Sequence, residues 1–522
     1  MYGEKIKENL RVVYKHSAVQ SLLINFVCLV VIFLIQVPHY TYDMDVMMQA
    51  QLFNISGTWS TGMLLFSNIY LGRFLKVLCG MSGHLNWYTN FQYAIIYLAL
   101  WKIGERFLRT NKSRISYVMY VIFNVFVGCE CYINISYMKT AALLCLSAIY
   151  VLYRNMMEQR QEGERLSYIY AGCAIVVGGL ISWKAVLISG GEGLICVLAL
   201  LTINKSLVTR NRRKALLTII GASLLIGLFQ MGDHMTYENT AEWARVSQYR
   251  DALEDIEMFG VQSYQTEMVE TAQLTEGEYR ILVDGKYISF DDNAFEKINN
   301  LAKMRQSITG QTIVDFLRTV PRNLFSVEMF YGNAILWLLL VFSKNGRKKI
   351  CLAATSGIVG ITYMIMYFVA SCNTSLVHFL ILLPAMGIPL CSATDMYVTK
   401  DERRSTIAFL LMACVLFYQK FGASMMTSVK TEEVESQLME DIDNLEKPWH
   451  VICLNDYLKS FSVFLRYDEG LIAGKNLVVL DGAYTLIPLY NGVVYPAGWS
   501  IEQETDTVNT EQNIVVWMYV IE

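Results

Sequence analysis

The sequence predicts a mainly α-helical protein that crosses a membrane many times, and three observations support this fold class. Of its 522 residues, 54% are hydrophobic and 17% are charged, whereas an ordinary globular protein is about 25% charged. Many apolar runs approach the ~20 residues that a helix needs to cross a bilayer. Lys and Arg are concentrated in alternate connecting segments, as in membrane proteins. This composition excludes a disordered chain and a nucleic-acid-binding protein.

About eleven apolar runs are candidate spans, several of them shorter than the helices we expect. Another apolar stretch, Gly62–Gly80, carries Arg73 and Lys76, so we expect a helix that lies on the membrane surface. The predicted spans are Leu22–Val37, Trp87–Ile103, Ile115–Val127, Met138–Leu152, Tyr168–Trp183, Ala185–Ile203, Ala215–Phe229, Phe330–Phe342, Ile350–Val369, Leu376–Leu390 and Thr406–Tyr418.

The distribution of Lys and Arg predicts the orientation of the chain. With the N-terminus inside, the inner segments hold 24 of the 43 Lys and Arg residues. The short outer turns after the first loop hold only Lys139 and Lys184. Because basic residues remain on the inner side, we expect the N-terminus inside and the C-terminus outside. The first run has no A-x-A cleavage signal after it, so we expect a retained signal anchor.

This topology divides the chain into membrane and outer parts. The large outer loop is acidic, and the spacing of its apolar residues predicts one helix at Thr240–Phe259 and another that ends near Pro321. Around Asp284 and Gly285 we expect a hairpin at Tyr279–Phe290. The predicted parts are an N-terminal membrane module at 1–230 with a first outer loop at 38–86, a large outer loop at 231–329, further spans at 330–421, and an outer domain at 422–522.

The C-terminal segment carries the patterns of both helix and strand. A charged helix is expected at Glu432–Leu445. Three apolar runs predict strands, at Val451–Leu454, Asn476–Leu480 and Ile514–Val520. We therefore expect a small α/β domain outside the membrane.

Two carboxylates, Asp43 and Asp45, follow the first span directly. A carboxylate at a membrane surface can take a proton from a hydroxyl, or bind a divalent cation near a phosphate. The alternative is that one of the two aspartates caps the next helix. The sequence supports the two interpretations about equally.

Several segments resemble the GT-C superfamily of membrane glycosyltransferases, in particular a group of Firmicutes membrane proteins of that architecture. The order of first span, acidic pair, amphipathic segment, many spans and outer domain is similar over nearly the whole chain. Two features depart from the pattern: Met44 separates the acidic residues, and Lys184 stands where an Arg is expected. The similar segments are Tyr42–Asp45, Ser56–Gly62, Ser67–Gly72, Asn86–Tyr88 and Arg245–Asp251.

The resemblance implies a hexosyltransferase of the bacterial cell membrane, which moves a sugar from a polyprenyl-phosphate donor to a glycan or lipid acceptor on the outer face. It implies Asp43, and next Asp45, as the general base that takes the proton of the acceptor hydroxyl. Basic residues should hold the donor phosphate. No cofactor is expected, although a divalent cation remains an option.

The substrate-binding candidates are Lys184, Arg245, Arg250 and His378. Each has a simpler interpretation. Lys184 can extend to the membrane surface or pair with Glu192. The two arginines lie in an acidic segment and can form surface ion pairs. His378 begins the tenth span, where a polar residue at the membrane surface needs no ligand.

Three other functions remain open. A polysaccharide polymerase also has many spans and one large outer loop, but its basic residues would lie in that loop. An envelope transporter usually has repeats, or charged or broken helices at mid-membrane, and the sequence shows neither a repeat nor a cluster of charges there. An inactive GT-C scaffold is the third alternative.

The topology is testable with reporters. A reporter that is active only outside the membrane should work when fused after Glu522, and it should be inactive when fused between Lys205 and Lys214, which we expect inside. A cytoplasm-only reporter that is active after Glu522 would overturn this orientation.

Overall fold

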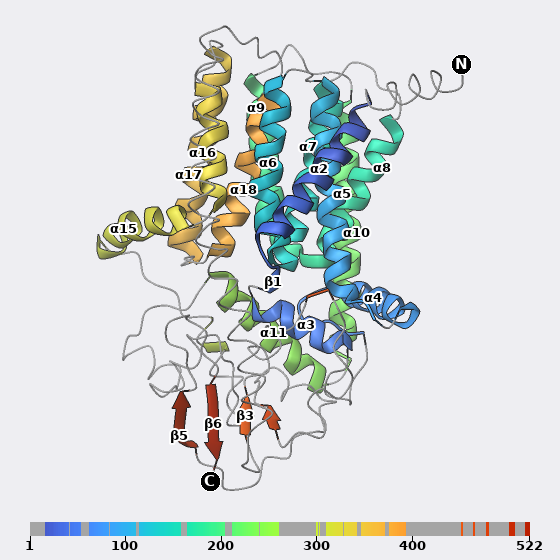
Figure 1. The fold of residues 1–522 in the computed structure, drawn as a ribbon, viewed down its shortest axis with the longest axis vertical. Coiled ribbons are helices and arrows are strands. Elements are labelled where there is room, and N and C mark those ends of the chain that lie inside the picture. Colours follow the sequence, from blue (N-terminus) through green and yellow to red (C-terminus); the bar gives the residue numbers. More distant parts are fainter. Residues whose placement is uncertain are drawn as a thin grey trace. The chain divides into compact units, whose positions relative to one another are not determined.

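A computed structural model gives the structure of the protein, which is mainly helical as the sequence predicts (Figure 1). The chain divides into two compact units. The first unit comprises Met1–Pro38, Phe91–Leu228 and Ile308–Phe421, and the second comprises His39–Asn90, Phe229–Ser307 and Gly422–Glu522. The structure describes residues 16–40, 42–53, 62–82, 84–110, 114–157, 164–203, 211–239, 241–259, 299–300, 302, 310–326, 328–341, 346–370, 375–392, 450–452, 463–464, 477–479, 501–506 and 517–521.

Long helices make up the first unit. Each predicted span falls on one of them, except Thr406–Tyr418, which lies outside the described residues. In the described ranges, four stretches are long and apolar enough to cross a membrane by length and composition: Ser17–Ile35, Tyr137–Met157, Arg165–Thr202 and Arg212–Tyr237. The elements are α2 (Ser17–Ile35), α5 (Trp87–Thr110), α6 (Arg114–Tyr132), β2 (Asn134–Ile135), α7 (Tyr137–Met157), α8 (Glu164–Ala185), η1 (Val186–Gly190), α9 (Gly191–Ile203), α10 (Arg212–Tyr237), α15 (Gly310–Ser326), α16 (Glu328–Val341), α17 (Gly346–Ala370) and α18 (Ser375–Ser392).

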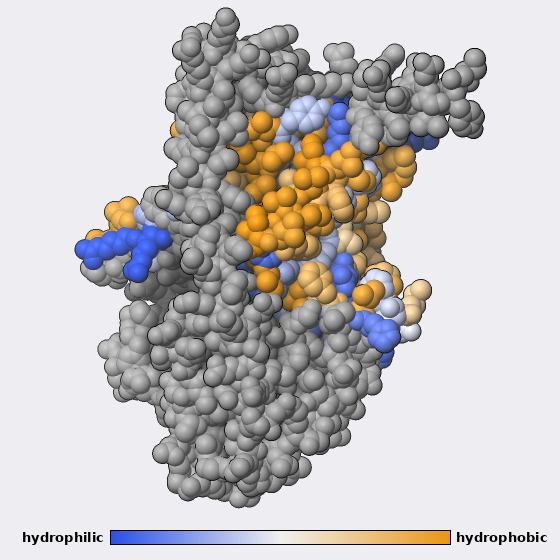
Figure 2. Space-filling model, in the orientation of Figure 1, coloured by the Kyte–Doolittle hydropathy of each residue, from blue (hydrophilic) through white to orange (hydrophobic). Residues whose placement is uncertain are grey.

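Helix α2 shows which side chains these helices expose and which they bury. Phe26 and Leu34 are exposed, at 55% and 77%, whereas Ser21 and Asn25 are buried. Asn25 accepts a hydrogen bond of 2.5 Å from the hydroxyl of Tyr120 on α6. Apolar side chains cover this face of the unit in Figure 2. A helix that buries its polar residues and exposes its apolar ones fits a lipid surrounding and not water.

Helix α7 forms the centre of the first unit. Its residues from Tyr137 to Met156 are all buried, and it packs against α8 and α18. Near its start, Lys139 forms an ion pair of 2.9 Å with Glu130 of α6. Near its end, Arg154 contacts the hydroxyl of Thr110. Both charged side chains are buried. Lys139 is stabilised there by an ion pair and Arg154 by a hydrogen bond.

The helical run between α8 and α9 is interrupted. Ser182 has extended backbone angles of φ −156° and ψ 106° inside α8, and the five residues Val186–Gly190 form a π-helix, η1. The sequence predicts the boundary of two spans at Lys184–Gly193, and the structure places the break at Ser182 and continues in helical conformation after it. Such π-helical turns occur mostly as local insertions and frequently at functional sites.

The second unit combines helices with a small sheet. Strand β3 lies parallel to β4 and antiparallel to β6, and β6 pairs with β5 antiparallel, in the order β4-β3-β6-β5. The predicted strands overlap β3, β4 and β6, whereas β5 was not predicted. The predicted helix Glu432–Leu445 and hairpin Tyr279–Phe290 lie outside the described residues. The elements are β1 (His39–Tyr40), α3 (Asp43–Phe53), α4 (Ile69–Met81), α11 (Ala241–Phe259), β3 (His450–Ile452), β4 (Leu477–Val479), β5 (Ile501–Asp506) and β6 (Trp517–Ile521).

Two predicted helix boundaries are wrong. Helix α15 does not end near Pro321 but continues through it to Ser326, and it belongs to the first unit. The stretch Gly62–Gly80 is helical only from Ile69 onward, because Asn68 caps α4 by accepting a hydrogen bond from the N–H of Tyr70. Gly62 lies in the left-handed region with φ of 69°, which glycine adopts at little cost.

Candidate functional site

The acidic segment forms the first turn of α3 in the second unit. Asp43 is the first residue of the helix, a position at which the helix dipole favours a negative charge. The side chain of Asp45 is completely buried. Its Oδ1 accepts a hydrogen bond of 2.6 Å from the hydroxyl of Tyr88, in the first turn of α5. Asp45 thereby ties α3 to the start of α5, and as an interior residue of α3 it is not the N-cap that the sequence allowed.

A second cluster of buried, hydrogen-bonded polar side chains lies around Asn86. The hydroxyls of Tyr40 and Thr89 are 2.5 Å apart, and the side-chain amide of Asn86 donates to Tyr40 at 2.9 Å. The same amide donates to the carbonyl of Val463 at 2.9 Å. The backbone N–H of Asn86 donates to the carbonyl of Phe464 at 3.1 Å. These bonds join the first outer segment to the C-terminal segment within the second unit.

The two aspartates therefore differ in what they can do. A general base must come within hydrogen-bond reach of the proton that it removes. Asp45 is buried and already accepts the short hydrogen bond of Tyr88, so its position suits a structural role better than proton transfer. Asp43 begins the same helix, but its side chain lies outside the description, so its role as the base stays a prediction.

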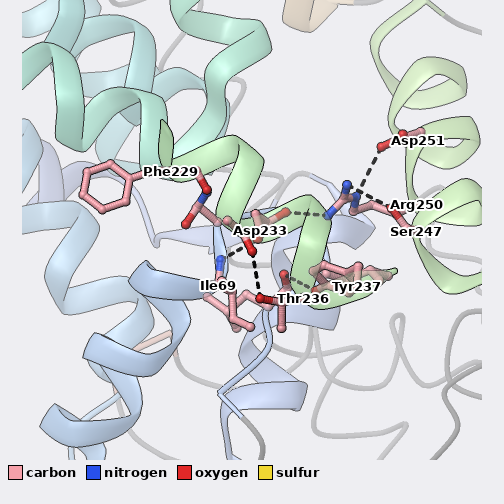
Figure 3. A network of polar contacts seen from close by, with 12 residues as sticks. Ile69, Phe229, Asp233, Thr236, Tyr237, Ser247, Arg250 and Asp251 are labelled. Atoms are coloured by element: carbon pink, nitrogen blue, oxygen red, sulfur yellow. Dashed lines mark hydrogen bonds and ion pairs between the residues drawn. The ribbon is translucent and has the colours of Figure 1, made fainter. Parts of the chain in front are cut away.

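Arg250 lies in a different polar network, which links three helices of the second unit (Figure 3). Asp233, near the end of α10, accepts a hydrogen bond of 2.8 Å from the N–H of Ile69 at the start of α4. Its other oxygen pairs with Arg250 of α11 at 3.2 Å. Arg250 also contacts Asp251 and the hydroxyl of Ser247, each at 3.2 Å.

An aromatic ring completes the surroundings of Arg250. The guanidinium carbon lies 4.9 Å from the centre of the Tyr237 ring, and the hydroxyl of Tyr237 donates to the carbonyl of Leu64 at 3.1 Å. Burial lowers the pKa of Arg250, but Tyr237, Asp251 and Asp233 raise it more, so the net shift is upward. The arginine is thus held as a cation by contacts inside the protein.

These contacts change the interpretation of both arginines. The side chain of Arg250 is 16% exposed and pairs with Asp233 of another helix as well as with Asp251 of its own helix, so the predicted pairing within its segment is present but is only one of its contacts. Since Asp233, Asp251 and Ser247 engage its guanidinium, Arg250 supports the fold rather than presenting a vacant phosphate site. Arg245 lies on the same helix, α11, and its side chain is outside the description.

Lys184 and His378 belong to the first unit. Lys184, near the end of α8, is partly exposed. His378 is 1% exposed and its ring lies 5.4 Å from that of Tyr363 on α17, so its side chain is enclosed by the protein, and its predicted position near the membrane surface stays a prediction. Within the described ranges, neither ring nitrogen of His378 has a hydrogen-bond partner.

Glu192 is an acidic residue of the first unit that is buried without a hydrogen-bond partner in the described ranges. It is 3% exposed in the first turn of α9, and neither carboxyl oxygen has a hydrogen-bond partner among the described residues. The ion pair with Lys184 that the sequence allowed is not formed. Ser189, three residues earlier, instead donates from its hydroxyl to the carbonyl of Leu380 on α18 at 2.7 Å.

A divalent cation finds no ready site in the part of the chain that the structure describes. No group of three or more His, Cys, Asp or Glu residues there could hold a metal ion. Because the side chain of Asp43 lies outside the description, the cation-binding and general-base interpretations of the acidic pair both stay predictions.

Sequence reasoning missed two residues that organise these networks. Asp233 is a single acidic residue just after the predicted span Ala215–Phe229. A lone charge beside a span usually has a partner inside the protein, and this could have indicated its ion pair. Tyr88 lies within one of the similar segments, but nothing in the sequence pairs it with Asp45.

Comparisons with protein-family models, with curated proteins and with solved structures found no match.

The Asp233 network makes a prediction about stability. Asp233→Ala removes the acceptor of the Ile69 N–H and leaves Arg250 without its interhelical partner. Losing one member of a buried pair costs about 3 kcal/mol or more of unfolding free energy. Glu238→Ala is the matched control, because Glu238 is 55% exposed and, among the described residues, pairs with the exposed His234. Its cost should be about 0.5 kcal/mol or less.

Heat denaturation of the purified protein in detergent measures both variants. The melting temperature of Asp233→Ala should be clearly below that of the wild type. The melting temperature of Glu238→Ala should equal that of the wild type. Equal melting temperatures for the two variants would contradict the structural role of Asp233.

Proposed function

We propose that this protein is a multi-pass membrane glycosyltransferase of the GT-C type. It would transfer a sugar from a polyprenyl-phosphate donor to a glycan or lipid acceptor of the cell envelope, on the outer face. The observation that supports this most is the acidic first turn of α3, which follows the first apolar helix. There the buried bond between Asp45 and Tyr88 fixes the turn that begins with Asp43.

In this proposal Asp43 is the general base. It accepts the proton of the acceptor hydroxyl while the hydroxyl oxygen attacks the anomeric carbon of the sugar. The bond from that carbon to the phosphate oxygen breaks, and the lipid phosphate leaves with the electron pair, which inverts the anomeric centre. Lys184 and Arg245 are the candidates that balance the phosphate charge. Asp45 and Tyr88 are positioning residues.

The proposed orientation has the N-terminus inside and the C-terminus outside, as the basic residues predict. The three segments of the second unit, His39–Asn90, Phe229–Ser307 and Gly422–Glu522, would then form its outer part. This arrangement agrees with chemistry on a lipid-linked donor at the outer face.

Substitution of the acidic pair tests the mechanism. Asp43→Asn keeps the size of the side chain but cannot accept the proton, so the transfer rate should fall by about 10²–10⁴. Asp45→Asn and Tyr88→Phe should lower the rate less and should lower the melting temperature, because they weaken a buried hydrogen bond. Lys184→Ala should mainly raise the KM for the donor. The assay is transfer of labelled sugar from polyprenyl-phosphate donors in membranes.

Two results would count against the proposal. Full activity of both Asp43→Asn and Asp45→Asn would exclude these residues as the base. A wild-type protein that is inactive with every donor sugar would favour a scaffold or a transporter.

One observation favours an envelope transporter as a second candidate function. The helical run after Ser182 contains the π-helix η1 and then the buried Glu192. At about 1.5 Å per residue, Glu192 lies about 14 Å along that run, near the middle of a hydrocarbon core of about 30 Å. Broken helices and buried ionisable residues at this depth are typical of transport pathways. The sequence predicted a span boundary near this break but not the π-helix.

Proton flux tests this second candidate. In proteoliposomes under an imposed potential, a transporter that uses Glu192 as its proton carrier should acidify the lumen, and Glu192→Gln should abolish the flux. Glu238→Gln, on an exposed glutamate, is the matched control and should leave the flux unchanged. Equal flux from wild type and Glu192→Gln would remove this candidate.

A further inference from the structure

A small pocket lies between α5, α7 and α8 of the first unit. Its volume is about 150 Å³, below the ~300–1,000 Å³ of sites for drug-sized ligands. Three basic residues of α5, Lys102, Arg106 and Arg109, and one acidic residue, Glu105, contribute to its lining. Three cations against one anion leave a positive excess, so a compact anionic group is the ligand that the pocket favours.

The polar wall of the pocket is fixed by contacts within the protein. Lys102 pairs with Glu105 at 2.7 Å, and Arg106, which is 6% exposed, contacts the hydroxyl of Ser167 on α8. Tyr170 of α8, which also lines the pocket, is bonded to Ser147 of α7 at 2.7 Å. The exposed Arg109, in the last turn of α5, provides positive charge at the edge. The site is therefore built before any ligand arrives.

The opposite wall is apolar. Val151 and Leu166 line the pocket, and Leu166 is 71% exposed. Ile169, on the next turn of α8, is 61% exposed, which continues this apolar surface along the helix. The ammonium of Lys102 lies 4.3 Å from the centre of the Trp101 ring, and Trp is enriched where membrane meets water. Charge and apolar surface thus adjoin at this pocket, as they do in a lipid with a charged headgroup and an apolar chain.

We propose that this pocket binds the phosphate of an anionic phospholipid, whose acyl chain runs along Leu166 and Ile169. Basic pockets between membrane helices bind anionic headgroups in this way. A free phosphate or a nucleotide offers the same anionic chemistry but would leave the apolar wall unused. The inference does not depend on the proposed sugar transfer, because the basic residues predict that these helix ends lie on the inner side of the membrane.

Native mass spectrometry of the full-length protein in detergent tests the proposal, with phosphatidylglycerol, phosphatidylcholine and inorganic phosphate as probes. Wild type should retain phosphatidylglycerol in preference to phosphatidylcholine. Arg109→Gln should weaken phosphatidylglycerol about fivefold, the effect of one basic residue near a headgroup. Arg213→Gln is the matched control, because Arg213 is exposed at the start of α10 and does not line the pocket. It removes the same charge and should leave binding unchanged.

Leu166→Gln separates a lipid from a soluble anion. It should weaken phosphatidylglycerol without changing the binding of inorganic phosphate. Equal losses in Arg109→Gln and Arg213→Gln would overturn the pocket assignment in favour of general charge attraction. Displacement of phosphatidylglycerol by submillimolar inorganic phosphate, with no effect of Leu166→Gln, would overturn the lipid in favour of a soluble phosphate compound.

Discussion

The main physical constraint on this structure is that its long helices expose apolar side chains and are long and apolar enough to cross a membrane. In hydrocarbon, a polar side chain has no solvent partner, so it must find one inside the protein. Helix α2 therefore turns Ser21 and Asn25 inward and leaves Phe26 and Leu34 outside. The hydroxyl of Tyr120 satisfies Asn25, and the backbone carbonyl of Trp101 accepts from Ser21 at 2.9 Å. The helix contacts follow from this requirement.

The same constraint explains why charged residues of the first unit are paired or hydrogen-bonded. Lys139 and Glu130 form an ion pair at 2.9 Å, and Arg106 and Arg154 contact hydroxyls of neighbouring helices. Glu192 departs from this rule in the described ranges, since neither carboxyl oxygen has a hydrogen-bond partner. A carboxyl group left in that state costs stability, which is why its place after the π-helix points to function rather than to folding.

In the second unit, hydrogen bonds connect segments that are distant in the chain. Asp45 is joined to Tyr88, Asn86 to the backbone of Val463, and Asp233 to the start of α4. Of these bonds, the one between Asp45 and Tyr88 holds the first turn of α3, which begins with Asp43, because it would leave an unsatisfied group if its partner moved. A rigid support of this kind is what a catalytic carboxylate requires, and it agrees with the role that we propose for Asp43.

The sequence by itself determined the helical class, the approximate limits of the apolar helices and the helix at Ala241–Phe259, because these follow from composition and short-range periodicity. It also drew attention to Asp43 and Asp45. Only the tertiary structure decided that Asp45 is tied to Tyr88, that Arg250 pairs with Asp233, and that His378 is buried. The sequence placed a span boundary at Lys184–Gly193, but only the structure put the break at Ser182 and the π-helix after it. The physical reason is that local propensity acts within a few residues, whereas buried polar groups are satisfied by partners that only the folded chain brings within hydrogen-bond distance.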